Sequence, residues 1–192
     1  MTATLRLFLA VNLPPAERRA IHAATAPLRA AAGGVSWVAE ENLHLTMKFF
    51  GAQPESAVEA LRAALAPAAA GAHAPTLDLG GLGAFPNLRA PRVVWMAVHP
   101  DPRLELLHHD LEVVCGAAGY EVDGRAFRPH LTLGRVRDKI APAGARAIAD
   151  AARGVHYRGR AVARSVELMA SELTPQGARY RVMASLPLKG GS

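Results

Sequence analysis

The sequence predicts an α+β fold made of two similar halves. Segments with strand-like spacing of apolar residues alternate with segments of helical spacing along the whole chain. The tetrapeptide His-Leu-Thr-Met at residues 44–47 returns as His-Leu-Thr-Leu at residues 130–133. An apolar strand pattern contains Leu7, 37 residues before the first histidine, and another contains Val93, 37 residues before the second. This repeated spacing indicates an internal duplication.

Each element of the first half follows from a local pattern. Residues 5–13 are apolar and end at a Pro-Pro pair, which predicts a buried strand. Residues 15–32 predict a helix, because a proline opens the segment, apolar residues recur at helical spacing and two glycines follow. The remaining expected elements are strands at 35–39 and 43–50, a helix at 55–70, an extended stretch at 76–82 and a Gly/Pro-rich loop at 80–91.

The second half repeats this order. Residues 92–98 predict a strong strand, and residues 104–119 predict a helix with Leu107, Leu111 and Val114 at helical spacing. Residues 127–133 predict the strand that carries the second His-Leu-Thr. A helix at 143–152 and strands at 161–173 and 180–186 complete the half. Each half therefore has the order strand, helix, strand, helix, strand.

Length and charge limit the fold and the partners. The 192 residues are half hydrophobic, enough for a buried core. We expect one domain over residues 1–192, made of two pseudo-symmetric lobes at about residues 1–90 and 91–188, with the terminal strands crossing between them. Such a duplicated unit carries its helices on the outer faces and brings equivalent strands together near its axis. The 22 Lys and Arg residues against 16 acidic ones favour anionic partners such as nucleic acid.

The cysteine content and the first residues bear on location. Cys115 is the only cysteine, which excludes an internal disulfide and a cysteine-based zinc cluster. The first 13 residues hold one basic residue, Arg6, and an apolar run too short to span a bilayer. We therefore expect a cytoplasmic protein without a membrane segment, and no feature of the sequence indicates an obligate protein partner.

The two His-x-Thr tetrapeptides are the strongest functional signal. In an extended strand, His44 and Thr46 share one face while Leu45 and the residue after Thr46 point to the other. The same alternation places His130 and Thr132 together. One such match is weak evidence, since a single histidine in a strand is more often structural. Two copies at the same place in a repeated architecture predict that both face one cleft.

Two imidazoles in one cleft suit acid–base catalysis. Imidazole titrates near neutral pH, so a neutral histidine can accept a proton from water while a protonated one donates to a leaving alkoxide. Threonine hydroxyls can donate hydrogen bonds to phosphate oxygens as charge builds on them. A strained cyclic phosphodiester suits such a site, and we expect neither a metal nor another cofactor.

These residues resemble the 2H phosphoesterase family, and within it the bacterial and archaeal RNA 2′,3′-cyclic phosphodiesterases, also called 2′-5′ RNA ligases. The likeness covers most of the chain. It includes RLFLAV at residues 6–11, WVAEENLHLTMKFFG at 37–51, LGAFP at 82–86 with PRVVW at 91–95, and FRPHLTLGR at 127–135. Met47 stands where many members carry Leu, a conservative change on the buried face.

The resemblance implies a bilobal fold with a central cleft between two antiparallel sheets. It also implies hydrolysis of a terminal 2′,3′-cyclic phosphate on RNA to a 2′-phosphate. In the family's usual assignment His44 protonates the departing 3′ oxygen and His130 activates the water, while Thr46 and Thr132 hold the phosphate. The symmetry of the pair leaves open which histidine is acid and which is base.

Four further residues are candidates for substrate binding. Lys48 continues the alternation of the first tetrapeptide, so we expect it either at the cleft or solvated at the strand end. Arg135 points away on strict alternation, but a bend at Gly134 would turn it toward the phosphate. Phe85 and Phe127 are candidates for stacking on an unpaired base, although a phenylalanine in such a position is more often a core residue.

Other interpretations of the sequence remain open. The same chemistry would serve a small cyclic nucleotide or the cyclic phosphate of an ADP-ribose derivative. A catalytically inactive RNA-binding module is a third interpretation, disfavoured because it would need no such quartet of His and Thr. The glycine cluster at residues 80–83 lacks the lysine of a P-loop, which argues against ATP-driven ligation. His108 and His109 diverge on a helix, so we expect surface positions and no metal cluster.

Overall fold

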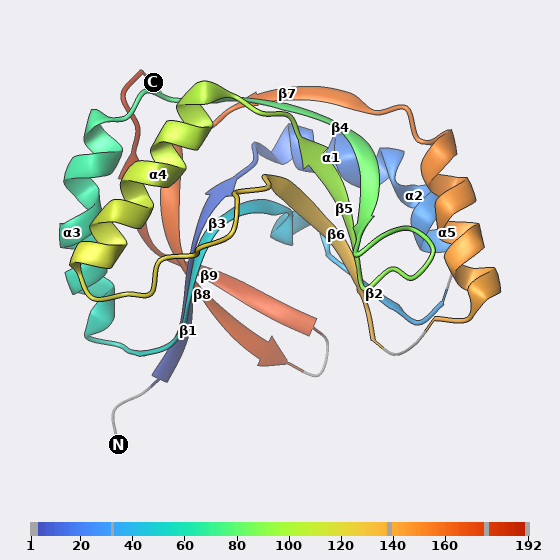
Figure 1. The fold of residues 1–192 in the computed structure, drawn as a ribbon, viewed down its shortest axis with the longest axis horizontal. Helices are drawn as coiled ribbons and strands as arrows, with labels where there is room; N and C mark the ends of the chain where they lie inside the picture. The colour runs from blue at the N-terminus through green and yellow to red at the C-terminus, as the bar shows by residue number, and fades with distance from the viewer. Residues whose placement is uncertain (1–3, 32, 138–139, 175–176, 191–192) are drawn as a thin grey trace.

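The computed structural model describes residues 4–31, 33–137, 140–174 and 177–190, and these residues form an α+β fold (Figure 1). The first half contains β1 (Thr4–Asn12), α1 (Pro15–Ala24), α2 (Ala26–Ala31), β2 (Val35–Trp37), β3 (His44–Pro54), α3 (Ala57–Gly71) and β4 (Thr76–Phe85). The second half contains β5 (Val93–Val98), α4 (Pro102–Ala117), β6 (His130–Val136), α5 (Pro142–Gly154), β7 (Arg158–Val162), β8 (Ser165–Thr174) and β9 (Gly177–Pro187). The predicted fold class is confirmed at this level.

The strands form one curled antiparallel sheet in the order β7-β4-β5-β6-β3-β1-β8-β9, with β2 paired to β6. The expectation of two separate sheets is wrong, because the two histidine-bearing strands pair with each other through Leu45 and Leu131. That contact joins the two groups of strands at the middle of the sheet. Helices α3 and α4 pack together on one side of the molecule, and α2 and α5 pack together on the other (Figure 1).

Strands β4 and β8 each pair with a strand of the other half of the chain. β4 follows α3 in the chain but pairs with β5, and β8 pairs with β1. As a result, β1 and β5 are central strands, and each histidine-bearing strand has a central strand on its other side. The site-bearing strands are therefore held at the middle of the sheet rather than at an exposed edge.

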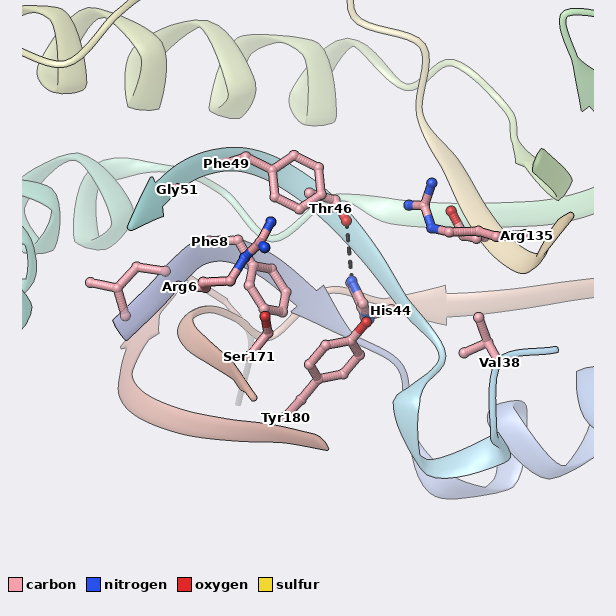
Figure 2. Close-up of a pocket in the computed structure, with 12 residues that line it drawn as sticks. Arg6, Phe8, Val38, His44, Thr46, Phe49, Gly51, Arg135, Ser171 and Tyr180 are labelled. Atoms are coloured by element: carbon pink, nitrogen blue, oxygen red, sulfur yellow. Dashed lines mark hydrogen bonds between the residues drawn. The ribbon is translucent and has the colours of Figure 1, made fainter. Parts of the chain in front are cut away.

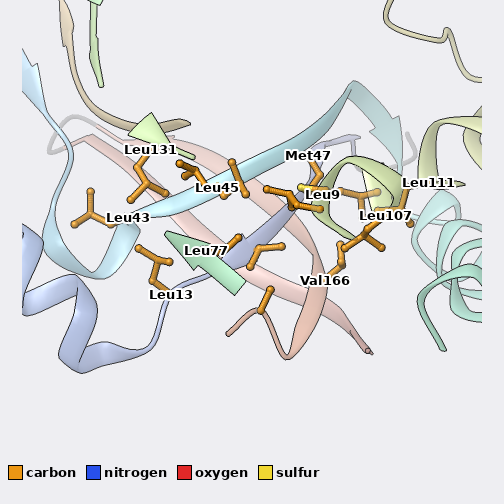
Figure 3. Close-up of a cluster of buried hydrophobic side chains, with 14 of the residues drawn as sticks. Leu9, Leu13, Leu43, Leu45, Met47, Leu77, Leu107, Leu111, Leu131 and Val166 are labelled. Carbon is orange, nitrogen blue, oxygen red and sulfur yellow. The ribbon is translucent and has the colours of Figure 1, made fainter. Parts of the chain in front are cut away.

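The core lies on the sheet face opposite the histidines. Leu45 and Leu131 are both fully buried, as the alternation of the tetrapeptides predicts. Figure 3 shows them among leucines from β1 and β4 and near the buried face of α4. Burying a leucine side chain contributes about 1.5–3 kcal/mol, so each tetrapeptide is firmly anchored on its apolar side.

Two sequence expectations need correction in the helical and loop regions. The helix expected over residues 15–32 is broken at Thr25, because Pro27 has no backbone N–H and belongs to the first turn of α2. Its expected last residue, 32, lies outside the described residues. Strand β4 continues through much of the expected loop at 80–91, since Gly80 and Gly81 form an irregularity in the β4–β5 pairing rather than ending the strand.

The last long strand segment also divides. Residues 161–173 belong to two strands, β7 and β8, which lie at different places in the sheet. The other expected elements are confirmed with shifts of a few residues at their ends. Helix α4, for example, begins earlier than expected because the Asp101 side chain accepts hydrogen bonds from the backbone N–H groups of Arg103 and Leu104.

Candidate active site

The pairing of β3 with β6 sets the positions of the four motif residues. Leu45 pairs with Leu131 in antiparallel register, and extending this register by one residue in each direction brings His44 toward Thr132 and Thr46 toward His130. In that extended register the two histidines are diagonal neighbours, a relationship that corresponds to about 7–8 Å in an antiparallel sheet. His44, Thr46 and Thr132 line one pocket (Figure 2). His130 lies beside it, two residues before Thr132 on the same face of β6.

Both imidazoles are held in the same way. Nδ1 of His44 is 2.7 Å from the backbone carbonyl of Asn42, and Nδ1 of His130 is 2.7 Å from the carbonyl of Arg128. A carbonyl only accepts, so each Nδ1 carries a proton and donates it. In the neutral rings this leaves the lone pair on Nε2. The Thr46 hydroxyl lies 3.1 Å from the His44 Nε2 and can donate to it.

Aromatic rings fix the orientation of each histidine. The His44 ring packs against Phe8 and Tyr180, with centroids 5.2 Å away in both cases. The His130 ring packs edge-on against Phe85, at 5.1 Å, and lies 6.3 Å from the ring of Trp95. Two unrelated sets of aromatic residues therefore perform the same positioning on the two sides of the site.

Burial lowers the pKa of His44 below its ordinary value of 6.5. The hydrogen bond to Asn42 opposes this shift, and the positive charge of Arg135 adds to the lowering. At neutral pH the free His44 imidazole is therefore neutral. Its Nε2 is ready to accept a proton. If a bound anion raises the pKa, the ring takes up a proton from solvent and can then donate it.

The pocket combines cationic and apolar side chains. Its empty volume is about 750 Å³, including the part open to solvent. Its lining comprises Arg6, Leu7, Phe8, Val38, His44, Thr46, Phe49, Gly51, Thr132, Arg135, Ser171 and Tyr180. None of these residues is acidic, and two are arginines. The arrangement suits an anionic ligand with an apolar part.

The comparisons with known proteins agree with this geometry. The model of the 2′-5′ RNA ligase superfamily matches residues 13–174, which is most of the chain. The chain belongs to the 2′-5′ RNA ligase superfamily. The family resemblance noted in the sequence is thereby confirmed.

Relatives within the superfamily carry a common name. A protein of Methanothermobacter thermautotrophicus named RNA 2′,3′-cyclic phosphodiesterase is 33% identical over 184 residues, covering 93% of this chain and 96% of that protein. A protein of the same name from Geobacillus stearothermophilus is 33% identical over 135 residues. That match covers 70% of this chain but only 43% of the relative.

Solved structures share the fold over nearly the whole chain. A Thermus thermophilus protein superimposes with a TM-score of 0.77 and 26% identity, covering 97% of this chain and 99% of the other. Escherichia coli LigT, in a crystal structure titled as a complex with 3′-AMP, gives a TM-score of 0.74 at 26% identity and the same coverage.

In this superfamily member both histidine-bearing strands contain a bulge after the threonine. The β1–β3 register shifts between Leu9 and Ala10, which leaves Met47 as the extra residue of β3. The β5–β6 register shifts between Val94 and Trp95, which leaves Leu133 as the extra residue of β6. Each bulge reverses the alternation that follows it. Arg135 therefore lines the pocket. This is the orientation that was expected if the strand bends near Gly134.

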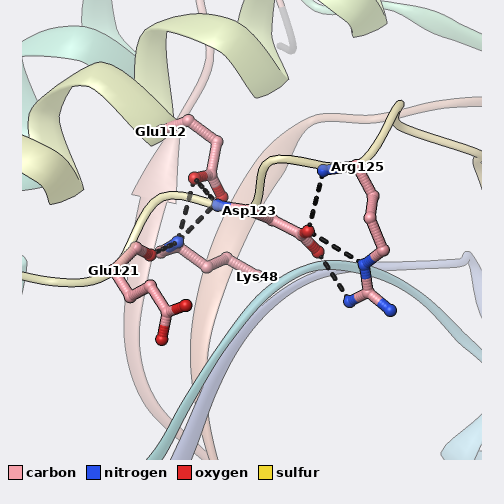
Figure 4. A network of polar contacts seen from close by, with 5 residues as sticks. All are labelled: Lys48, Glu112, Glu121, Asp123 and Arg125. Atoms are coloured by element: carbon pink, nitrogen blue, oxygen red, sulfur yellow. Dashed lines mark hydrogen bonds and ion pairs between the residues drawn. The ribbon is translucent and has the colours of Figure 1, made fainter.

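The bulge at Met47 also determines where Lys48 lies. Lys48 was expected at the cleft or in solvent at the strand end, and both expectations are wrong. Its side chain is buried on the opposite face, where Nζ lies 2.9 Å from both carboxylate oxygens of Glu112 on α4 and donates to the backbone carbonyl of Glu121 at 2.6 Å. Figure 4 shows Glu112 also accepting from the backbone N–H of Asp123. Lys48 thus ties β3 to α4 and to the segment that leads into β6. The place at the pocket that alternation assigned to Lys48 belongs to Phe49.

The two candidate stacking residues have different surroundings. Phe85 packs on Trp95 and His130 beside the site, so its ring is a support for His130. The expectation that Phe127 stacks on a base has no support in its surroundings, since it does not line the pocket and stacks on His108 at 3.9 Å between ring centroids. The expectation of a surface His108 is also corrected, because this stacking leaves it only partly exposed.

Several pocket residues escaped the sequence analysis, namely Arg6, Phe8, Phe49, Ser171 and Tyr180. Arg6 and Phe8 alternate with the buried leucines of β1, so the strand pattern carried a signal for them. Tyr180 carried none, since it reaches His44 only because β8 places β9 near β1.

Two further properties concern metals and membranes. Among the described residues, no group of three or more His, Cys, Asp or Glu side chains is placed to hold a metal ion. No helix in the same residues is long and apolar enough to cross a bilayer.

Proposed function

We propose that this chain is an RNA 2′,3′-cyclic phosphodiesterase that opens a terminal 2′,3′-cyclic phosphate to a 2′-phosphate. The observation that carries the proposal is the pairing of the two histidine-bearing strands at Leu45 and Leu131, with Nδ1 of each histidine bound to a backbone carbonyl. The superfamily membership and the name shared by the relatives support the same activity.

The reaction requires one group that accepts a proton from water and another that donates a proton to the leaving oxygen. Water attacks phosphorus, and one histidine accepts its proton at Nε2. The bond between phosphorus and the 3′ oxygen breaks, and the other histidine donates a proton to that oxygen, so the phosphate remains on the 2′ oxygen. Positioned acid and base groups of this kind each accelerate such reactions by about 10²–10⁴-fold.

Three other pocket residues act on the phosphate. Thr46 and Thr132 donate hydrogen bonds to the non-bridging oxygens as charge builds on the five-coordinate phosphorus. Arg135 supplies a guanidinium that binds the same oxygens. We assign His44 as the acid and His130 as the base. Because burial keeps free His44 neutral, its acid role depends on the phosphate anion raising its pKa on binding.

We also infer that the sheet comprises two lobes related by duplication. One lobe carries β3, β1, β8 and β9, and the other carries β6, β5, β4 and β7. The pairing of β4 with β5 and of β8 with β1 supports the expected crossing of strands between the halves. The expected cytoplasmic location, which rests on the single Cys115, stays a prediction.

The test is product analysis with an oligoribonucleotide that ends in a 2′,3′-cyclic phosphate. We expect a 2′-phosphate end as the product, formed equally well with and without EDTA. Formation of a 3′-phosphate would reverse the choice of leaving oxygen, and a strict requirement for added divalent metal would overturn the acid–base mechanism.

A further inference from the structure

Two arginines enter the pocket from opposite sides of β3. Arg135 comes from β6 and Arg6 from β1, and these strands are the two neighbours of β3 in the sheet. Figure 2 shows the guanidinium of Arg6 near Phe8 and Phe49, with Thr46 and His44 between it and Arg135. The pocket therefore has two separate cationic points.

Neither guanidinium has an acidic partner among the described residues. The ion pairs found there involve other basic side chains. No Asp or Glu lines the pocket. Two like charges in one pocket without a counter-ion favour a ligand that carries more than one negative charge.

The spacing separates Arg6 from the reacting phosphate. Ala10 pairs with Thr46, and Arg6 lies four residues before Ala10 on β1. At about 3.4 Å per residue, the Cα atoms of Arg6 and Ala10 are about 14 Å apart along the strand. The arginine side chain covers only part of that length. Its guanidinium is therefore displaced from the threonines by a distance on the scale of a nucleoside.

The surface next to Arg6 is aromatic (Figure 2). Phe49 is 67% exposed although it lines the pocket, and its ring centroid lies 5.9 Å from that of Phe8. An exposed aromatic ring next to cationic groups is a suitable surface for the sugar or base of a nucleotide. The order along the pocket is then phosphate site, aromatic surface and second guanidinium.

We propose that Arg6 binds a second phosphate of the substrate, the one on the 5′ oxygen of the terminal nucleotide. In RNA this is the last internucleotide linkage. The inference rests on the proposed function for the identity of the first phosphate, and it makes the substrate an oligonucleotide end rather than a nucleoside cyclic phosphate.

Binding tests the second site without turnover. The ligands are adenosine 2′-monophosphate and adenosine 2′,5′-bisphosphate, measured by calorimetry at constant ionic strength. We expect the bisphosphate to bind about 10–100-fold more tightly, as charge-assisted hydrogen bonds allow. Arg6→Gln should remove this preference and Arg6→Lys should restore part of it. The control is Arg181→Gln, since Arg181 is exposed, pairs with Ala170 of β8 and does not line the pocket.

Turnover separates this inference from the proposed function. The substrates are adenosine 2′,3′-cyclic phosphate and a dinucleotide ending in a 2′,3′-cyclic phosphate. Arg6→Gln should reduce kcat/KM on the dinucleotide at least about tenfold more than on the mononucleotide. Equal losses on both, or no loss, would overturn the role of Arg6. A wild-type protein that prefers the bisphosphate but hydrolyses neither substrate would instead overturn the proposed function and leave the second site standing.

Discussion

Phe49 and Arg135 each lie five residues after the histidine of their strand, and both side chains line the same pocket. The two strands therefore share a local irregularity as well as a tetrapeptide, because each contains a bulge directly after its threonine. The symmetry is in the backbone and not in the chemistry. β3 places an apolar ring at the pocket and β6 places a cation there, so the two sides of the pocket differ chemically.

Removal of either histidine should abolish most turnover. His44→Ala and His130→Ala are each expected to reduce kcat by about 10²–10⁴-fold, since each removes one positioned proton-transfer group. The double variant should be little worse than either single one, because the two act as a unit. His109→Ala, an exposed histidine on α4, is the control and should keep normal rates. If a single variant retained near-normal kcat with intact circular dichroism, that histidine would have no place in the mechanism.

The pKa of His44 should respond to Arg135. The positive charge of Arg135 lowers this pKa together with the larger effect of burial, so Arg135→Gln should raise it while leaving it below 6.5. Titration of the imidazole proton resonances by NMR measures both values in the absence of substrate. Arg181→Gln removes an equal charge outside the pocket and should leave the titration unchanged. An unchanged or lower pKa in the Arg135 variant would show that Arg135 does not lower the pKa of His44.

The sequence predicted the orientation of the site residues correctly where side chains alternate regularly between the two faces of a strand. Alternation correctly put the leucines of both tetrapeptides in the core, and the repeated spacing indicated that the two strands meet. It failed at Lys48, because a bulge depends on the strand alongside and not on the residues of the bulged strand alone. The single continuous sheet and the contact of Tyr180 with His44 could not be predicted from the sequence. Both depend on how strands from distant segments are ordered in the sheet.

The buried pair of Lys48 and Glu112 should be important for stability. Lys48→Met leaves the Glu112 carboxylate buried without its cation, which typically costs about 3–5 kcal/mol of unfolding free energy. Replacing both, with Lys48→Met and Glu112→Leu, should recover much of that loss because no charge is left unpaired. Urea unfolding measures all three proteins.

The control for this pair is the exposed ion pair of Arg62 and Glu59 on α3. Arg62→Met should change the unfolding midpoint little, since exposed pairs are screened by solvent. A Lys48→Met protein as stable as this control would contradict the role of the pair as a tether between β3 and α4.

Gly83 should be required for the positioning of His130. A Cβ atom at residue 83 would lie 2.4 Å from the ring of Trp95, so alanine there must displace the indole. Trp95 packs against Phe85 and His130, and its displacement would loosen the surroundings of the imidazole. We expect Gly83→Ala to reduce kcat about tenfold or more, in line with the cost of misplacing a catalytic group. Tryptophan fluorescence should change in parallel.

Gly154→Ala, where a Cβ would meet no atom within 4 Å, should alter neither property. Normal kcat in Gly83→Ala with shifted fluorescence would mean that the indole moves without disturbing His130, and the positioning role would then rest on Phe85 and the Arg128 carbonyl alone.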